Sequence, residues 1–194
     1  MRNWKRVETG DGPLFRSTLA LHEAALLRNL VGSVVGMLDD RESSTPADEL
    51  EAITGMRTGN TSPPGDGTMR RLLPDFYRPE VGAPDGTLDG DSLNAALRSL
   101  HEPEIIDAKR CAAQQLLDTL PERGGRLELT EGQANSWIAA VNDIRLALGT
   151  MLHIGPDGLD RLPADHPMAG QLSVYQWLTA LQEYLVVALM GRRR

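Results

Sequence analysis

The chain has 194 residues, of which 41% are hydrophobic and 24% charged, with a formal net charge of −7 and a pI of about 5.1. This length is enough to bury a substantial core, so we expect a single domain. The charge excludes a strongly basic nucleic-acid-binding domain, because such domains bind phosphates through a basic stripe, whereas the cations here form small separate groups.

Two further features of composition indicate a cytoplasmic protein. The start of the chain carries no basic segment followed by an apolar one, and one cysteine cannot form a disulfide framework. The most apolar stretch, VYQWLTALQEYLVVALM, is interrupted by Gln176, Gln182 and Glu183. We therefore expect no membrane span.

The first forty residues predict a hairpin followed by a long helix. NWKRVE and PLFRS alternate like strands, and TGDG between them is typical of a turn. Thr18 is the expected N-cap of the helix LALHEAALLRNLVGSVVGMLDD. Gly32 and Gly36 lie one turn apart in this helix, which predicts that another helix approaches closely there.

The middle of the chain predicts short elements and a linker. STPADELEAITG is typical of a short helix, NTSPPGDG of a loop, and TMRRLLPDFYRP of one helical turn followed by an extended exit. Residues 80–91 are rich in Gly, Pro and Asp, which indicates a flexible linker or loop. The single domain, 1–194, would then have an N-terminal lobe, 1–79, and a helical C-terminal lobe, 92–194.

The second half is more regular. A helix begins at Asp91 or Ser92, and Pro103 either breaks it, kinks it, or opens a second helix that ends near residue 120. GGRLELT predicts a short strand, and Thr130 with Gln133 has capping-box spacing for the helix that follows.

The helix predicted over residues 172–190 is apolar on most of its circumference, as in a central helix or one shared with a partner. The expected fold class is mainly α with a minor antiparallel β-sheet, formed by the N-terminal hairpin and one short strand around a helical core.

No pattern of catalytic or ligand-binding residues is present in the sequence. Glycine-rich nucleotide motifs and G-x-S-x-G are absent, and the four histidines lack metal-ligand spacing. We therefore expect no enzyme activity, no cofactor and no metal.

The single cysteine, Cys111, lies in HEPEIIDAKRCAAQQLLDTL. A free cysteine is usually buried, but on a helical wheel Cys111 lies opposite the apolar stripe, beside Gln114 and Gln115. We expect at least partial exposure, which makes Cys111 the candidate redox residue. Lys109 falls within the apolar stripe, so we expect it to extend to solvent or to pair with a carboxylate of another helix.

Six segments carry a resemblance to a known family: NWKRVETGDGPLFR, DDRESS, RRLLPDFYRP, LHEPEIIDAKR, LTEGQANSWIAAVNDIRLALG and YQWLTALQEYLVVALMG. They resemble the actinobacterial AosR-type family of oxidative-stress transcriptional regulators, formerly a family of unknown function. The similarity covers nearly the whole chain outside residues 80–91. It implies a regulator that responds to oxidants, acts through a stress sigma factor of RNA polymerase and raises the expression of cysteine-biosynthesis genes.

The resemblance also raises a question about redox switching, which in this family is associated with an intramolecular disulfide. A chain with only Cys111 cannot form that bond. Three alternatives remain: a disulfide between two chains, a sulfenate or mixed disulfide, or a member that is not itself a sensor.

The segment of residues 70–78 is the candidate partner-binding surface. It combines arginines and aromatic residues, which are enriched at interfaces, namely Arg70, Arg71, Phe76, Tyr77 and Arg78. The alternative is that Leu72, Leu73 and Phe76 only pack the segment onto the core.

Three alternative functions stay open. The chain is a directly DNA-binding regulator that uses Lys5, Arg6 and Arg16, an unrecognised enzyme with a deep pocket of titratable groups, or a structural homodimer. A homodimer through residues 172–190 is compatible with a protein-binding regulator, with a DNA-binding regulator and with an enzyme. A protein-binding regulator would contact DNA at most indirectly.

Overall fold

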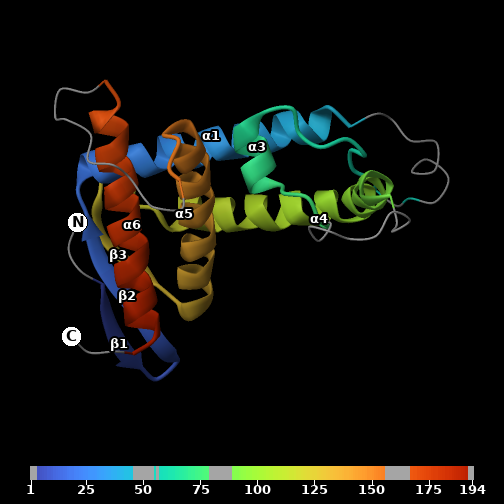
Figure 1. The fold of residues 1–194 in the computed structure, drawn as a ribbon. Helices are drawn as coiled ribbons and strands as arrows, with labels where there is room; N and C mark the ends of the chain where they lie inside the picture. The colour runs from blue at the N-terminus through green and yellow to red at the C-terminus, as the bar shows by residue number, and fades with distance from the viewer. Residues whose placement is uncertain (1–3, 46–54, 56, 79–88, 156–166, 192–194) are drawn as a thin grey trace. The chain divides into compact units, whose positions relative to one another are not determined.

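The computed structural model describes residues 4–45, 55, 57–78, 89–155 and 167–191 (Figure 1). Its elements in chain order are β1 (Lys5–Thr9), β2 (Gly12–Leu19), α1 (Leu21–Ser43), α3 (Gly67–Leu72), α4 (Gly90–Thr119), β3 (Gly125–Leu129), α5 (Glu131–Met151) and α6 (Ala169–Leu189). The predicted fold class, mainly α with a minor antiparallel sheet, is confirmed. The short helix predicted over residues 44–55 lies mostly outside the described residues.

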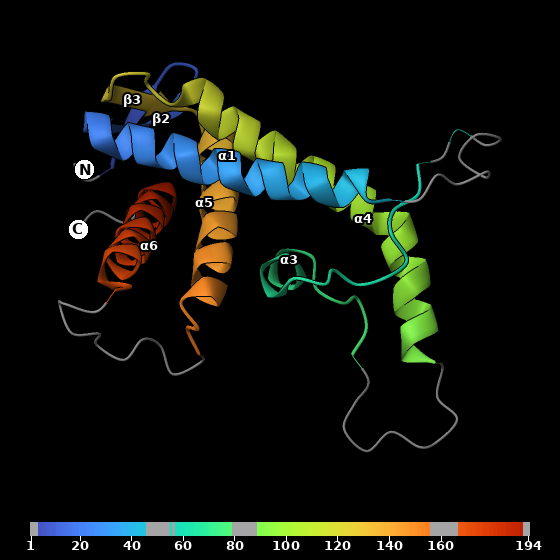
Figure 2. The same ribbon diagram turned by 90° about the horizontal axis from the view of Figure 1, so that it is seen from above.

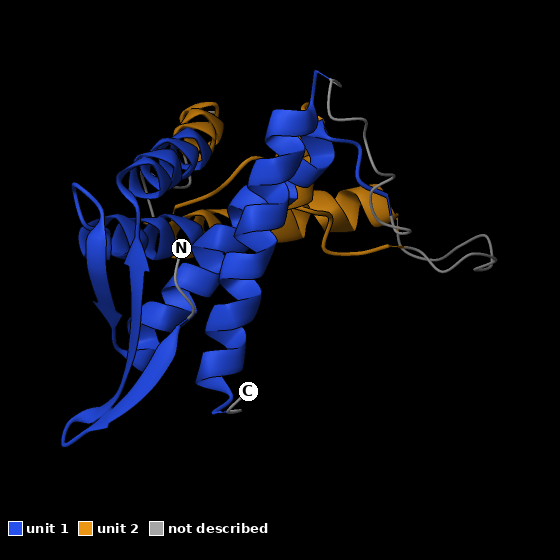
Figure 3. Ribbon diagram, turned by 90° about the vertical axis from the view of Figure 1, so that its left-hand side faces the viewer, with its two compact units in different colours: residues 1–35, 109–194 blue, residues 36–108 orange. Residues whose placement is uncertain are grey.

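The chain forms two compact units (Figure 3). Unit 1 consists of residues 1–35 and 109–194, and unit 2 of residues 36–108. Helices α1 and α4 each contribute residues to both units. The lobes predicted at 1–79 and 92–194 remain a prediction, because most of the linker between them lies outside the described residues.

The sheet of unit 1 has the strand order β1-β2-β3, with both pairs antiparallel. Lys5 pairs with Arg16 at one end of the hairpin, and Thr9 with Gly12 at the turn, where Gly12 has φ +112°. Because side chains alternate across a strand, Phe15 and Leu129 point to one face and are fully buried. Helices α5 and α6 pack against the sheet (Figure 1).

The end of strand β2 differs from the sequence prediction. Thr18 is not a helix N-cap, because it lies within β2 and pairs with Arg126 of β3. Helix α1 begins at Leu21, and the Glu23 carboxylate accepts a hydrogen bond from the Ala20 N–H at 2.7 Å. A strand more than a hundred residues later therefore extends β2 beyond the point that local capping residues indicate.

Gly124 allows the chain to enter β3 next to the start of α1. It has φ +71°, and a Cβ at this position would lie 2.7 Å from the Leu21 nitrogen. By contrast, the close helix approach predicted at Gly32 and Gly36 is wrong. A Cβ at either position would meet no described atom within 4 Å.

Helix α4 continues through Pro103 and is bent (Figure 2). Proline has no N–H to donate to the carbonyl four residues earlier, which is that of Ser99. The Gly59 N–H donates to this carbonyl instead, at 2.7 Å. A Cβ on Gly59 would lie 2.8 Å from the Pro103 Cδ, which is closer than normal van der Waals contact. A side chain at this position would therefore push the loop away from α4.

Helix α5 is capped as predicted. The Thr130 hydroxyl accepts from the Gln133 N–H at 3.3 Å, and the Gln133 side chain accepts from the Thr130 N–H at 2.9 Å. Trp137 is fully buried and meets Trp4 in an edge-to-face contact with centroids 5.9 Å apart. Helix α6 buries one side, through Leu178, Leu181 and Leu185 among others. No described helix is both long and apolar enough to cross a membrane.

Candidate functional site

Cys111 is exposed on α4, which confirms the prediction from the helical wheel. The Gln115 amide donates to the Cys111 Sγ at 3.7 Å, and its oxygen accepts from the Ser136 hydroxyl of α5 at 2.8 Å. The thiol is thus open to solvent and has a neighbouring donor that α5 holds in position.

Lys109 pairs with a carboxylate of another helix, which is one of the two alternatives predicted for it. Its Nζ lies 2.6 Å from the Oδ1 of Asp143 on α5. Burial raises the pKa of Asp143, while the hydrogen bond and the charge of Lys109 act in the opposite direction and only partly offset it. Lys109 therefore serves the packing of α4 on α5 and is engaged there rather than at Cys111.

The predicted partner-binding segment is anchored in unit 2 by its leucines. Leu72 and Leu73 are 2% and 3% exposed. The side chain of Asn94, on α4, binds the backbone of Tyr77 through two hydrogen bonds. Its oxygen accepts from the Tyr77 N–H at 2.8 Å, and its amide donates to the Tyr77 carbonyl at 2.9 Å. The packing alternative thus holds for the two leucines.

The arginines and aromatic residues of this segment remain largely accessible. Arg71 and Arg78 are exposed, Phe76 is 38% exposed, and Tyr77 is half-buried. Arg70 is exposed but its Nε donates to the Pro64 carbonyl at 2.6 Å, so this arginine is turned toward its own loop. The structure therefore keeps Arg71, Phe76 and Arg78 available on a backbone that is held in place.

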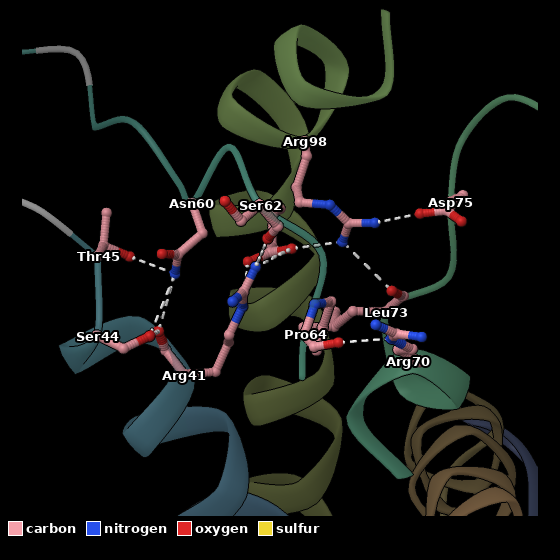
Figure 4. Close-up of polar contacts among 11 residues, drawn as sticks. Arg41, Ser44, Thr45, Asn60, Ser62, Pro64, Arg70, Leu73, Asp75 and Arg98 are labelled. Carbon is pink, nitrogen blue, oxygen red and sulfur yellow. Dashed lines mark hydrogen bonds and ion pairs between the residues drawn. The ribbon is translucent and has the colours of Figure 1, made fainter. Parts of the chain in front are cut away.

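A buried ion cluster underlies this segment (Figure 4). It consists of the buried Arg98 and Glu102, the nearly buried Arg41, and Asp75, whose side chain is 50% exposed. Arg98 and Glu102 are each 1% exposed and pair at 2.8 Å, one turn apart on α4. The second oxygen of Glu102 lies 2.7 Å from the Arg41 Nε. Arg98 also donates to the Leu73 carbonyl at 3.3 Å and to Asp75 at 2.7 Å.

The cluster joins four parts of unit 2. Arg41 lies near the end of α1 and donates to the Ser62 carbonyl at 2.6 Å, while Asn60 donates to the Arg41 carbonyl at 3.1 Å. The guanidinium carbon of Arg98 lies 6.0 Å from the centre of the Phe76 ring, a cation–π distance. The charges therefore position the exposed segment rather than perform chemistry.

Sequence reasoning missed this cluster. The only local signal was the spacing of Arg98 and Glu102, which is common on solvent-facing helices and does not indicate burial. Within the described ranges, no group of three His, Cys, Asp or Glu side chains could hold a metal ion.

The N-terminal cations proposed for DNA contact are divided by the sheet. Lys5 and Arg16 are cross-strand partners on one face, whereas Arg6 is paired opposite Phe15 and points to the other. Arg6 bonds to Glu8 at 2.7 Å and to the Leu189 carbonyl at 3.4 Å. The three residues do not form one patch.

Comparison with known proteins shows the family to which this chain belongs. The model of the family "Domain of unknown function (DUF2017)" matches residues 1–189. The chain belongs to this family. The protein named oxidative stress regulator AosR in Mycobacterium tuberculosis strain H37Rv is 69% identical over 196 residues, which cover 100% of this chain and 90% of that protein. A Mycobacterium leprae relative, also named for AosR, is 64% identical over 194 residues, which cover 98% and 89%.

These relatives confirm the predicted resemblance to the AosR-type family, and their names support a role in oxidative-stress regulation. No solved structure matches the chain.

Proposed function

We propose that this protein is a cytoplasmic, non-enzymatic regulator of the oxidative-stress response that binds a stress sigma factor or RNA polymerase and raises the expression of cysteine-biosynthesis genes. The observation that carries the regulatory role is the 69% identity, along the whole chain, to proteins named as oxidative stress regulators. The acidic net charge of −7 favours contact with protein and leaves contact with DNA to the partner.

The segment of residues 70–78 is the proposed contact surface. Arg71 and Arg78 have no polar partner within the described part of the chain, and Phe76, which lies between them in sequence, is 38% exposed. Arginine and aromatic side chains dominate the energetics of many protein interfaces. Because Asn94 and the buried ion cluster already hold the backbone, binding would order few additional groups, which lowers the entropic cost of association.

Cys111 is the proposed redox residue. Peroxide would oxidise the thiol to a sulfenic acid and release one water. A second thiol, from another copy of the chain or a small cellular thiol, would then form a disulfide and release a second water. The exposed position of Cys111 allows both steps without unfolding.

The test is association of the full chain with purified sigma factors and polymerase, in reductant and after peroxide. Glu substitutions at Arg71 and Arg78 should weaken association by roughly tenfold or more, since each removes a cation and adds a carboxylate. Arg123→Glu is the matched control, because Arg123 is exposed and lies outside this segment.

To test the role of the thiol, the same association measurement, in reductant and after peroxide, is repeated with Cys111→Ser. Association that requires peroxide and is lost in this variant would support a switch based on one thiol. Equal association in both conditions would retain the regulator and remove Cys111 from the mechanism. Failure to bind any sigma factor or polymerase in either condition would contradict the proposed function.

A further inference from the structure

The sheet of unit 1 has an outer face that α5 and α6 do not cover. Strand alternation places on it the residues that lie between the buried ones. The charged and aliphatic residues of this face are Lys5, Val7, Leu14, Arg16, Arg126 and Glu128. At the hairpin end, the described helices of unit 1 lie on one side of the sheet only (Figure 3).

The charges on this face are unbalanced. Lys5 and Arg16 are direct cross-strand partners, an arrangement that is destabilising for like charges. Glu128 is the single carboxylate of the face, and its Oε1 is shared by the Nε of Arg16 at 3.1 Å and the Nε of Arg126 at 3.5 Å. Lys5 has no acidic partner among the described residues. Three cations and one carboxylate thus share one small surface of a chain whose net charge is −7.

An apolar pair lies beside the charged row. Val7 and Leu14 are cross-strand partners two pairs nearer the hairpin turn than Lys5 and Arg16, which makes them the next row on the same face, and both are only half-buried. Successive rows on one face of a sheet are about 7 Å apart, which is also the spacing of alternate side chains in an extended peptide. An extended segment with aliphatic and acidic residues two positions apart would match both rows.

The same features argue against nucleic acid as the occupant. This face has no aromatic side chain on which a base could stack, and base stacking is a main source of affinity for single strands. Three cations close to a carboxylate would also release few counterions from a duplex. Val7 and Leu14 would have no apolar group to contact on a phosphate backbone.

We propose that the outer sheet face binds an acidic, aliphatic peptide segment of a protein partner, with carboxylates at Lys5, Arg16 and Arg126 and an aliphatic side chain over Val7 and Leu14. This surface belongs to unit 1, whereas the segment of residues 70–78 belongs to unit 2. The inference therefore does not depend on the proposed sigma-factor contact.

The test is selection from a phage-displayed library of random peptides about 12 residues long, which span about 40 Å when extended. The full chain is the immobilised target. Enriched peptides should carry Asp or Glu alternating with aliphatic residues. Their affinity should fall by roughly tenfold or more for Lys5→Glu/Arg126→Glu and less for the neutral variant Lys5→Gln/Arg126→Gln.

Both substituted positions are exposed, and the Arg126 side chain is 74% exposed, so the variants should fold normally. Arg123→Glu is a single charge reversal just outside the sheet and should bind the peptides like the unmodified chain. Three results would overturn the inference: no enrichment, enriched peptides without carboxylates, or equal binding by the charge-reversed variant. Tight binding of an oligonucleotide that the same variant abolishes would assign the face to nucleic acid instead.

Discussion

Glu102→Gln should destabilise unit 2 far more than a surface substitution does. Glu102 accepts three hydrogen bonds from buried or nearly buried guanidinium groups: two from Arg41, at 2.7 and 3.2 Å, and one from Arg98 at 2.8 Å. Hydrogen bonds to an ionised group are stronger than neutral ones by about 1 kcal/mol each. Neutralising Glu102 while keeping its shape should therefore lower the free energy of unfolding by about 3 kcal/mol, within the range measured for broken buried ion pairs.

The choice of assay follows from where the tryptophans lie. Trp4, Trp137 and Trp177 all belong to unit 1, so tryptophan fluorescence would not report on unit 2. Urea unfolding followed by far-ultraviolet circular dichroism, with amide hydrogen exchange in residues 67–78 and 90–108, would report on it directly. Faster exchange should appear first in residues 73–78, because Arg98 bonds to the Leu73 carbonyl and to Asp75.

Glu104→Gln is the matched control, because Glu104 is exposed on the same helix and should change stability by less than about 0.5 kcal/mol. If Glu102→Gln and Glu104→Gln have equal effects on stability and exchange, the cluster does not hold this unit together. In that case the cluster does not position the contact segment either.

Further substitutions test other contacts of the fold. Gly59→Ala should lower the free energy of unfolding, measured in urea, by about 1–3 kcal/mol, because its Cβ would lie 2.8 Å from the Pro103 Cδ. Gly36→Ala has open space around it and should raise the free energy of unfolding by up to about 1 kcal/mol, because alanine favours the helix. The raised pKa of Asp143 means that the folded chain binds a proton more tightly than the unfolded chain. The stability that this proton contributes is present at low pH and is lost as pH rises from 3.8 through the folded pKa, so the free energy of unfolding, relative to Asp143→Asn, should fall across that window. A thiol reagent should label Cys111 in the folded chain within about tenfold of its rate in denaturant, and protection well beyond that would contradict its exposure.

Elements with local patterns were predictable from the sequence. The hairpin, the Thr130–Gln133 capping box and the exposed side of Cys111 follow from alternation, capping spacing and helical period, each set by residues a few positions apart. For Lys109, its place in an apolar stripe predicted either extension to solvent or pairing with a carboxylate, and the structure shows the pairing. The sequence did not identify Asp143 as that partner.

The tertiary structure decided whatever depends on residues far apart in the chain. Pairing with β3 keeps Thr18 within β2. The Gly59 N–H donates to the carbonyl that Pro103 leaves without a donor, and helix α4 continues at the point where the sequence allowed a break, a kink or a new helix. Arg98 and Glu102 have the spacing of a surface pair, yet Arg41 and the loop that carries Leu73 bury them. Local periodicity determines which elements form, whereas burial and pairing depend on what packs against each face, and that information is not local in the sequence.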